Sequence, residues 1–222
     1  YVLAVYSCKK VSNSNPTDDG KYLGDTTIVY NTGLIPLTIS ELLSIPVVDT
    51  STLPVFGKIS QLTLLSSYDL NNTQPGLPPP QKQKYNDCAA WSVVYGMLGY
   101  LYGVLGGYLN YNDLLGNLSR DKIFSPAFVY NQNNRDVDSG ISFLTAFDFI
   151  KHNGCCKLTD MEMFTATPFV QPSSTAVTNA TFNKISDFFR LQTVDLTIMK
   201  SLLSIRKIPI VFSCEVDNNF RY

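Results

Sequence analysis

Residues 87–105 read Asp-Cys-Ala-Ala-Trp-Ser-Val-Val-Tyr-Gly-Met-Leu-Gly-Tyr-Leu-Tyr-Gly-Val-Leu, with no charged side chain after Asp87. Apolar residues on every side of a helix are typical of a helix that is buried all round or lies in a membrane. A membrane span needs about 20 apolar residues, whereas this run is shorter and is interrupted by three glycines. We therefore expect a central core helix, with Asp87 as its N-cap and Cys88 in its first turn.

The position of Cys88 at the start of this helix has a chemical consequence. Unpaired backbone N–H groups and the helix dipole stabilise an anion there, so they lower the pKa of a thiol and raise its thiolate fraction. A thiolate at the end of a buried helix suits nucleophilic acyl transfer. The alternative is a cysteine that serves only as a small buried hydrophobe, and the helix position by itself favours that alternative.

The composition is that of a globular protein. Of the 222 residues, 45% are hydrophobic and 16% are charged, which is enough apolar material for a sizeable core in one or two domains. The net charge is −1 and no basic run is longer than Lys9-Lys10, so we expect no nucleic-acid partner. Five cysteines without a C-x-x-C pair, and the single histidine His152, favour neither a disulfide framework nor a zinc site.

The first twenty residues differ in character from the rest. The apolar run Tyr1–Ser7 leads to Cys8 and then to a polar stretch, 11–20, which together resemble the end of a bacterial lipoprotein signal peptide. In this interpretation Cys8 is a lipid anchor and 11–20 is a flexible tether, since such a polar segment is hard to place inside a domain. The alternative is a first β-strand followed by an unrelated cysteine, and the bulky Tyr6 favours it.

Residues 21–66 form an N-terminal extended region. Short apolar runs alternate there with Pro and Gly, and we expect strands or extended pieces at 26–30, 34–39, 42–48 and 59–65. The Pro-rich stretch 71–80 predicts an extended, solvent-facing loop. The remaining unit, 67–222, contains Cys88.

The segment Gln83-Lys-Tyr-Asn-Asp-Cys88-Ala-Ala-Trp91-Ser-Val-Val-Tyr95 resembles the active-site segment of papain-like cysteine peptidases. The resemblance is to the bacterial branch, in which a tryptophan lies three residues after the nucleophile. Ser67–Leu70 and Leu77–Pro79 resemble the lead-in of that branch.

Later segments follow the family's order. Residues 124–131 resemble its second helix, and Ser125 as N-cap with Pro126 at the first position also predicts a helix start there. Residues 138–154 resemble the glycine-lined subsite wall and third helix, and 202–214 resemble the amphipathic helix and first strand of the second lobe. The whole match runs from about Tyr68 to Phe220.

The resemblance implies an α+β papain-like fold of two lobes, with the helical lobe present and the β-rich lobe truncated because most of it lies beyond Tyr222. It implies a cysteine endopeptidase or exopeptidase in which Cys88 attacks the peptide bond. Gln83 would donate to the oxyanion, and Ser139 and Gly140 would pair with the substrate backbone. We expect a monomer with a peptide or protein substrate and no metal or organic cofactor, located in the bacterial cell envelope or secreted.

The sequence departs from the family beside the nucleophile. Lys82 stands where the family has its oxyanion glutamine, so a one-residue deletion is needed to bring Gln83 into register, and Gln81 is the alternative. The residue before Cys88 is Asp87, whose carboxylate opposes thiolate formation unless a cation such as Lys82 or Lys84 neutralises it.

The family's catalytic histidine is also absent. It lies about 130–150 residues after the cysteine, a window that opens near residue 218, and no histidine occurs between there and Tyr222. His152 is expected at a helix C-terminus, where its charge is favourable, and not as the base. A fragment of a longer peptidase explains this better than a degenerate one. The rivals are a non-catalytic binding or scaffold lipoprotein with the same fold and, less favoured, an acyltransferase or amidase.

Overall fold

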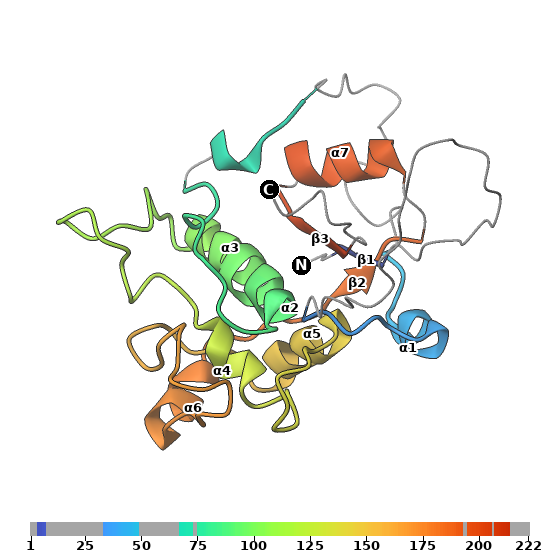
Figure 1. The fold of residues 1–222 in the computed structure, drawn as a ribbon. Coiled ribbons are helices and arrows are strands. Elements are labelled where there is room, and N and C mark those ends of the chain that lie inside the picture. Colours follow the sequence, from blue (N-terminus) through green and yellow to red (C-terminus); the bar gives the residue numbers. More distant parts are fainter. Residues whose placement is uncertain are drawn as a thin grey trace, which may run out of the picture.

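The computed structural model describes residues 4–7, 33–48, 67–72, 75–192, 195–205 and 207–213, and for 4–7 the backbone alone. Its centre is one continuous helix made of α2 (Cys88–Ala90), the π-helical segment η4 (Trp91–Leu98) and α3 (Gly99–Leu105). Figure 1 shows this helix between the short helices α4 (Pro126–Tyr130), α5 (Phe143–His152) and α6 (Ser174–Ala180) on one side and a small sheet on the other.

The central helix is the core element that the sequence predicts. Over Cys88–Leu105 it is long and apolar enough to cross a membrane by length and composition, but 67% of it is buried inside the protein. Among the described residues Ala89, Ala90, Val93 and Val94 have no exposed surface. These small side chains let α4 and α5 pack closely against its first turns.

Side-chain caps start both neighbouring helices, and the start at Ser125 and Pro126 is the one that the sequence predicts. Ser125 precedes Pro126 and accepts a hydrogen bond from the N–H of Phe128, which begins α4. Ser142 accepts from the N–H of Thr145 and begins α5. Such caps satisfy N–H groups that have no partner inside the helix.

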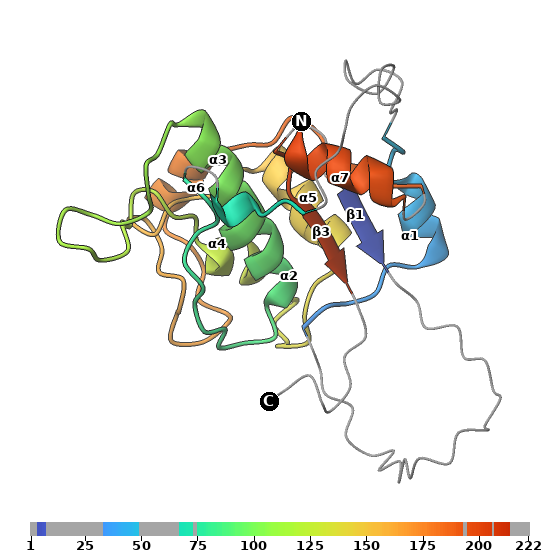
Figure 2. The ribbon, with the colours of Figure 1, turned by 90° about the horizontal axis from the view of Figure 1, so that it is seen from above.

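The sheet contains β1 (Ala4–Ser7), β2 (Phe189–Arg190) and β3 (Ile210–Ser213), all parallel, in the order β2-β1-β3. Helix α7 (Leu196–Ser204), capped by Asp195, leads to β3 and lies along the sheet in Figure 2. The helix and strand expected at 202–214 are thus present. Ala4–Ser7 form a strand, as in the alternative interpretation of the N-terminal run, whereas Cys8 and 11–20 lie outside the described residues, so the lipid anchor stays a prediction.

The prediction of extended structure at 42–48 is wrong for 42–44, which are helical. Ile39–Ser44 form the helix α1, because Thr38 and Glu41 make a capping box. The Thr38 hydroxyl accepts from the N–H of Glu41 at 3.2 Å, and the Thr38 N–H donates to the Glu41 carboxylate at 2.8 Å. Val47 then forms a single parallel bridge with Arg190, a residue of the strand Phe189–Arg190. The runs expected at 26–30 and 59–65 lie outside the described residues.

The sequence predicts that the Pro-rich loop faces solvent, but part of the loop is buried. After the 3₁₀ turn η3 (Leu70–Asn72), Gly76 and Pro78 are buried against the central helix. The Tyr111 hydroxyl is 3.2 Å from the Gly76 carbonyl and 3.1 Å from the Gly99 carbonyl, so it ties the loop to the helix. The loop therefore fixes the path of the chain toward Cys88.

Candidate functional site

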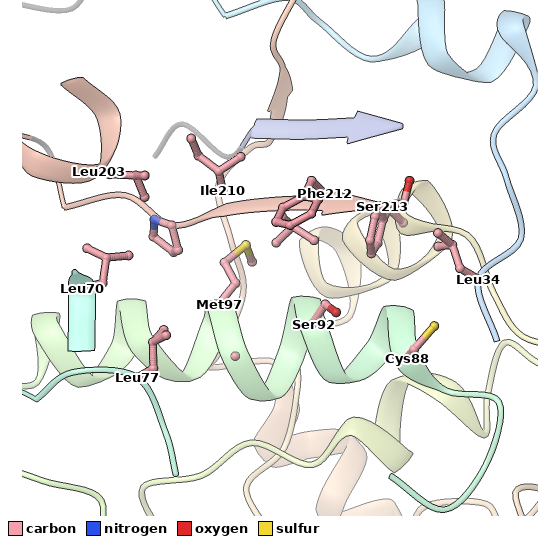
Figure 3. Close-up of a pocket in the computed structure, with 14 residues that line it drawn as sticks. Leu34, Leu70, Leu77, Cys88, Ser92, Met97, Leu203, Ile210, Phe212 and Ser213 are labelled. Atoms are coloured by element: carbon pink, nitrogen blue, oxygen red, sulfur yellow. The ribbon is translucent and has the colours of Figure 1, made fainter. Parts of the chain in front are cut away.

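Cys88 is the first residue of α2 and is half-buried. Figure 3 shows its side chain pointing from the end of the central helix toward β3. Cys88, Cys155 and Cys156 are all thiols, and the last two are fully buried, as expected of structural cysteines. Of these three, Cys88 alone has a surface that a substrate could reach.

We expected the helix end to lower the pKa of the Cys88 thiol, but in the described part of the chain this pKa is raised. Burial, followed by the charge of Asp87, raises the pKa of the Cys88 thiol to about 11. The N–H groups of the first turn act in the opposite direction but are outweighed. Desolvation disfavours an anion more strongly here than the helix end favours it.

Asp87 stands at the N-cap position but does not cap the helix. Its Oδ2 instead accepts a hydrogen bond from the Trp91 indole at 2.9 Å, and its Oδ1 is buried with no hydrogen-bond partner among the described residues. Asp87 is only 2% exposed, and this burial raises the pKa of its carboxyl to about 6. Near pH 7 Asp87 is thus largely an anion beside the thiol.

The lysines that could neutralise Asp87 are directed elsewhere. Lys84 places its ammonium 3.4 Å from the Thr165 carbonyl and above the Tyr85 ring. Lys82 is exposed. The ion pairs within the described part of the chain are Arg120–Glu162 and Lys151–Asp187, and neither involves Asp87.

Gln83, the predicted oxyanion donor, lies exposed in the loop before Cys88. Its amide nitrogen donates to the carbonyl of Tyr85 at 2.5 Å, within its own loop. Gln81 and Lys82 are exposed in the same loop. For Gln83 to donate to an oxyanion at Cys88, its side chain would first have to break its hydrogen bond to the Tyr85 carbonyl.

Asp138 has a role beside Cys88 that the sequence did not predict, although it is the first residue of 138–154, the segment that resembles the subsite wall. Its carboxylate accepts from the Asn86 N–H at 3.0 Å and from the Tyr130 hydroxyl at 2.6 Å, and its carbonyl accepts from the Asn86 amide at 2.8 Å. These bonds hold the residues just before Cys88 against the predicted subsite wall. No local sequence signal identifies such a long-range partner.

Residues 33–35, which we call the strap, lie against that wall. The Gly33 carbonyl accepts from the Ile141 N–H at 3.1 Å, and the Ile35 N–H donates to the Ile141 carbonyl at 3.1 Å. A Cβ on Gly33 would lie 2.3 Å from the Asn86 backbone, and one on Gly140 would lie 2.3 Å from the Gly33 carbonyl. Both glycines have positive φ, so this close approach requires glycine at both positions.

The predicted substrate-binding residues Ser139 and Gly140 use their N–H groups internally. The Ser139 N–H donates to Val137 at 2.7 Å, and the Gly140 N–H donates to the Tyr130 hydroxyl at 3.2 Å. Since the strap pairs with Ile141, a substrate backbone could use this wall only after the strap moves.

His152 is the last residue of α5, where the sequence predicts it, and it is exposed. Its Nδ1 lies 2.8 Å from the Asp148 carbonyl of the same helix. Among the described residues no three His, Cys, Asp or Glu side chains cluster as metal ligands would.

Cys88 opens into a cavity of about 580 Å³ between the central helix and β3. Figure 3 shows Leu34 near the Cys88 end of this cavity and Leu70 near its other end. Most of its lining is apolar, and the polar side chains are those of Cys88, Ser92 and Ser213.

No protein-family model matches the sequence, and no curated protein matches it. Among solved structures, the crystal structure of xylellain, a cysteine protease from Xylella fastidiosa, is similar, with a TM-score of 0.57 and 16% sequence identity. The similarity covers 78% of this chain and 62% of xylellain, so the chain spans less than two thirds of that protein's length. The fold is that of a papain-like protein. At this identity the likeness concerns the fold alone.

We expect Asp87→Asn to lower the pKa of Cys88 from its value of about 11, because the neighbouring negative charge is removed while burial remains. The thiolate fraction at pH 8 should rise about tenfold for each pH unit by which the pKa falls. The pH dependence of Cys88 alkylation, followed by peptide mapping, measures this. Asp148→Asn, an exposed change on α5, is the matched control, and equal profiles for the two variants would contradict the assigned role of Asp87.

We expect Gly33→Ala to displace the strap, because its methyl group would overlap the Asn86 backbone. Hydrogen exchange of the Ile141 amide should then become faster, as this N–H loses its bond to residue 33. Gly107→Ala is the matched control, since Gly107 also has positive φ but has no neighbour within 4 Å of an added Cβ. Faster exchange at Ile141 in both variants alike would refute the packing argument.

Proposed function

We propose that this chain carries the nucleophile of a cysteine-type peptidase and that Cys88 is the attacking residue. The observation that best supports this is the place of Cys88, at the start of a buried helix and at the mouth of a cavity, in a fold similar to that of a cysteine protease. The whole activity is a proposal, because the likeness spans only part of that protein.

In the proposed reaction the Cys88 sulfur attacks the carbonyl carbon of a peptide bond. The Cys88 N–H and the amide of Gln83, once turned away from Tyr85, would stabilise the tetrahedral oxyanion. The amine then leaves with a proton, and an acyl-enzyme remains at Cys88. Water releases the acid and restores the thiol.

The proposal requires an imidazole that faces Cys88 and that is not among these 222 residues. An imidazolium there would stabilise the thiolate and lower the pKa of Cys88, against the burial and the Asp87 charge that now raise it. It would also protonate the leaving amine. Because His152 lies on α5 and bonds to its own helix, it does not take this role.

A second candidate is a non-catalytic binding or scaffold protein with the same fold, and two features are compatible with it. In the described residues the Cys88 thiol has a raised pKa and the neighbouring wall is occupied by the strap. A protein that has lost catalysis has no need of an activated thiol.

Cleavage of a mixed peptide substrate by the full-length protein tests the proposal. We expect Cys88→Ala to reduce hydrolysis to background, because the sulfur forms the covalent intermediate. Cys156→Ala, which removes another thiol from the same lobe, should retain activity if thermal unfolding shows that it folds.

Labelling by a thiol-directed epoxide gives an independent measurement. Cys88 should react faster than Cys214 in the folded full-length protein, because only an activated thiol attacks an epoxide readily. Hydrolysis that survives Cys88→Ala, or labelling that is no faster at Cys88 than at Cys214, would exclude Cys88 as the nucleophile.

A further inference from the structure

The carboxyl group of Asp87 is buried in a place that does little to stabilise a charge. Only 2% of the residue is exposed, and Oδ1 has no hydrogen-bond partner within the described part of the chain. Oδ2 accepts from one side chain, the Trp91 indole, at 2.9 Å. A buried carboxylate is ordinarily hydrogen-bonded through both oxygens or paired with a cation, because the loss of water is otherwise costly. The ionised form of Asp87 is therefore unfavourable in this structure.

The groups that face Asp87 do not compensate its charge. Asp138, an acid from the wall segment, and Tyr130, a phenol from α4, both interact electrostatically with it. The next residue of its own helix is the Cys88 thiol. Lys84 directs its ammonium to a backbone carbonyl of another segment, and the strap has no titratable side chain. These neighbours favour the binding of a proton by Asp87.

The titration of Asp87 agrees with these surroundings. Burial is the largest cause and raises the pKa of the carboxyl to about 6, although the hydrogen bond from the Trp91 indole acts in the opposite direction. The charge of Asp138 adds to the rise. Because this pKa is above the usual value, the folded protein holds the proton at a pH at which the unfolded chain has already released it. The proton is bound below about pH 6 and is lost above it.

The same proton affects the neighbouring thiol. After burial, the charge of Asp87 is the next cause of the raised pKa of Cys88. The interaction of two titrating groups is reciprocal, so protonation of Asp87 lowers the pKa of Cys88 by as much as the Asp87 charge had raised it. In mildly acid solution the thiol therefore ionises more readily than its behaviour at neutral pH predicts.

We propose that Asp87 is a proton-binding site that regulates Cys88. In mildly acid solution a proton from water binds to the Asp87 carboxylate, the negative charge beside the sulfur disappears, and ionisation of the thiol becomes easier. In neutral solution the proton leaves, and the charge again opposes the thiolate. That this favours peptide hydrolysis in acid rests on the proposed function, whereas the proton site and its effect on the thiol do not.

The fluorescence of Trp91 reports the proton directly. Trp91 is the only tryptophan of the chain, and its indole donates to the carboxyl that titrates. We expect the emission of the 222-residue protein to change with a midpoint near pH 6. His152 is the only histidine, and an imidazole ordinarily titrates in the same range. His152→Gln should therefore keep the transition, and Asp87→Asn should remove it.

Alkylation of Cys88 by N-ethylmaleimide, followed by peptide mapping, measures the effect on the thiol. Below the pKa of a thiol the rate falls about tenfold for each pH unit, or about a hundredfold from pH 7 to pH 5. We expect the wild-type rate to fall at least threefold less, because loss of a neighbouring charge in a partly buried site is worth roughly threefold or more. His152→Gln should match the wild type, and Asp87→Asn should show the full fall.

An emission that does not change with pH in His152→Gln, a transition that survives Asp87→Asn, or a full hundredfold fall in the wild-type rate would each overturn the proposal. If thermal unfolding shows that Asp87→Asn does not fold, the His152→Gln titration and the wild-type rates still decide. Absence of peptide hydrolysis by the full-length protein would instead count against the proposed function and would leave these measurements unaffected. The two failures are therefore distinguishable.

Discussion

Burial of the central helix is the constraint on which the rest of the described structure depends. Ala89 and Ala90 at its start are small enough for α4 and α5 to approach closely. Farther along, Gly99 meets Pro78, where an added Cβ would lie 2.9 Å from the proline ring, and Gly103 meets the Tyr111 hydroxyl. Two of the three glycines that interrupt the apolar run, Gly99 and Gly103, are thus places where other parts of the chain lie directly on the helix.

The same burial determines the chemistry at the helix end. A helix N-terminus stabilises a nearby anion mainly within its first turn, and by no more than about 2 kcal/mol. Cys88 and Asp87 both lose water, and two adjacent groups that favour a negative charge cannot both be stabilised in a poorly solvated site. Desolvation therefore raises both pKa values, and the charge of Asp87 raises that of Cys88 further. A neighbouring cation would reverse this, and the lysines of the loop do not provide it.

Local signals were sufficient to predict much of the helical lobe. The apolar run predicted the central helix, and Ser125 with Pro126 predicted the start of α4, whereas the strand β3 was expected from the family resemblance. The capping box of Thr38 and Glu41 was present in the sequence but was overlooked, because the Pro and Gly around it suggested extended structure. The strap and the bonds of Asp138 could not be predicted. The strap pairs with Ile141, more than 100 positions away, and Asp138 binds Asn86 at a separation of 52 positions. No local pattern specifies which backbone groups meet over such distances. Nor could the sequence show that desolvation would outweigh the helix end at Cys88.

The residues before Cys88 belong to a closed ring of contacts, so their position is a joint property of distant segments. Asn86 touches Gly33 through its backbone and binds Asp138 through its N–H and amide. Asp138 binds Tyr130, whose hydroxyl accepts from Gly140, and Gly140 in turn packs against Gly33. In a ring of this kind no member can shift without breaking a hydrogen bond or creating a clash at another member. The strap therefore has a structural part in holding the start of the central helix, in addition to covering the wall beside it. Movement of the strap away from the wall would remove its packing against the backbone of Asn86, two residues before Cys88, but would not itself break the hydrogen bonds of Asn86 to Asp138.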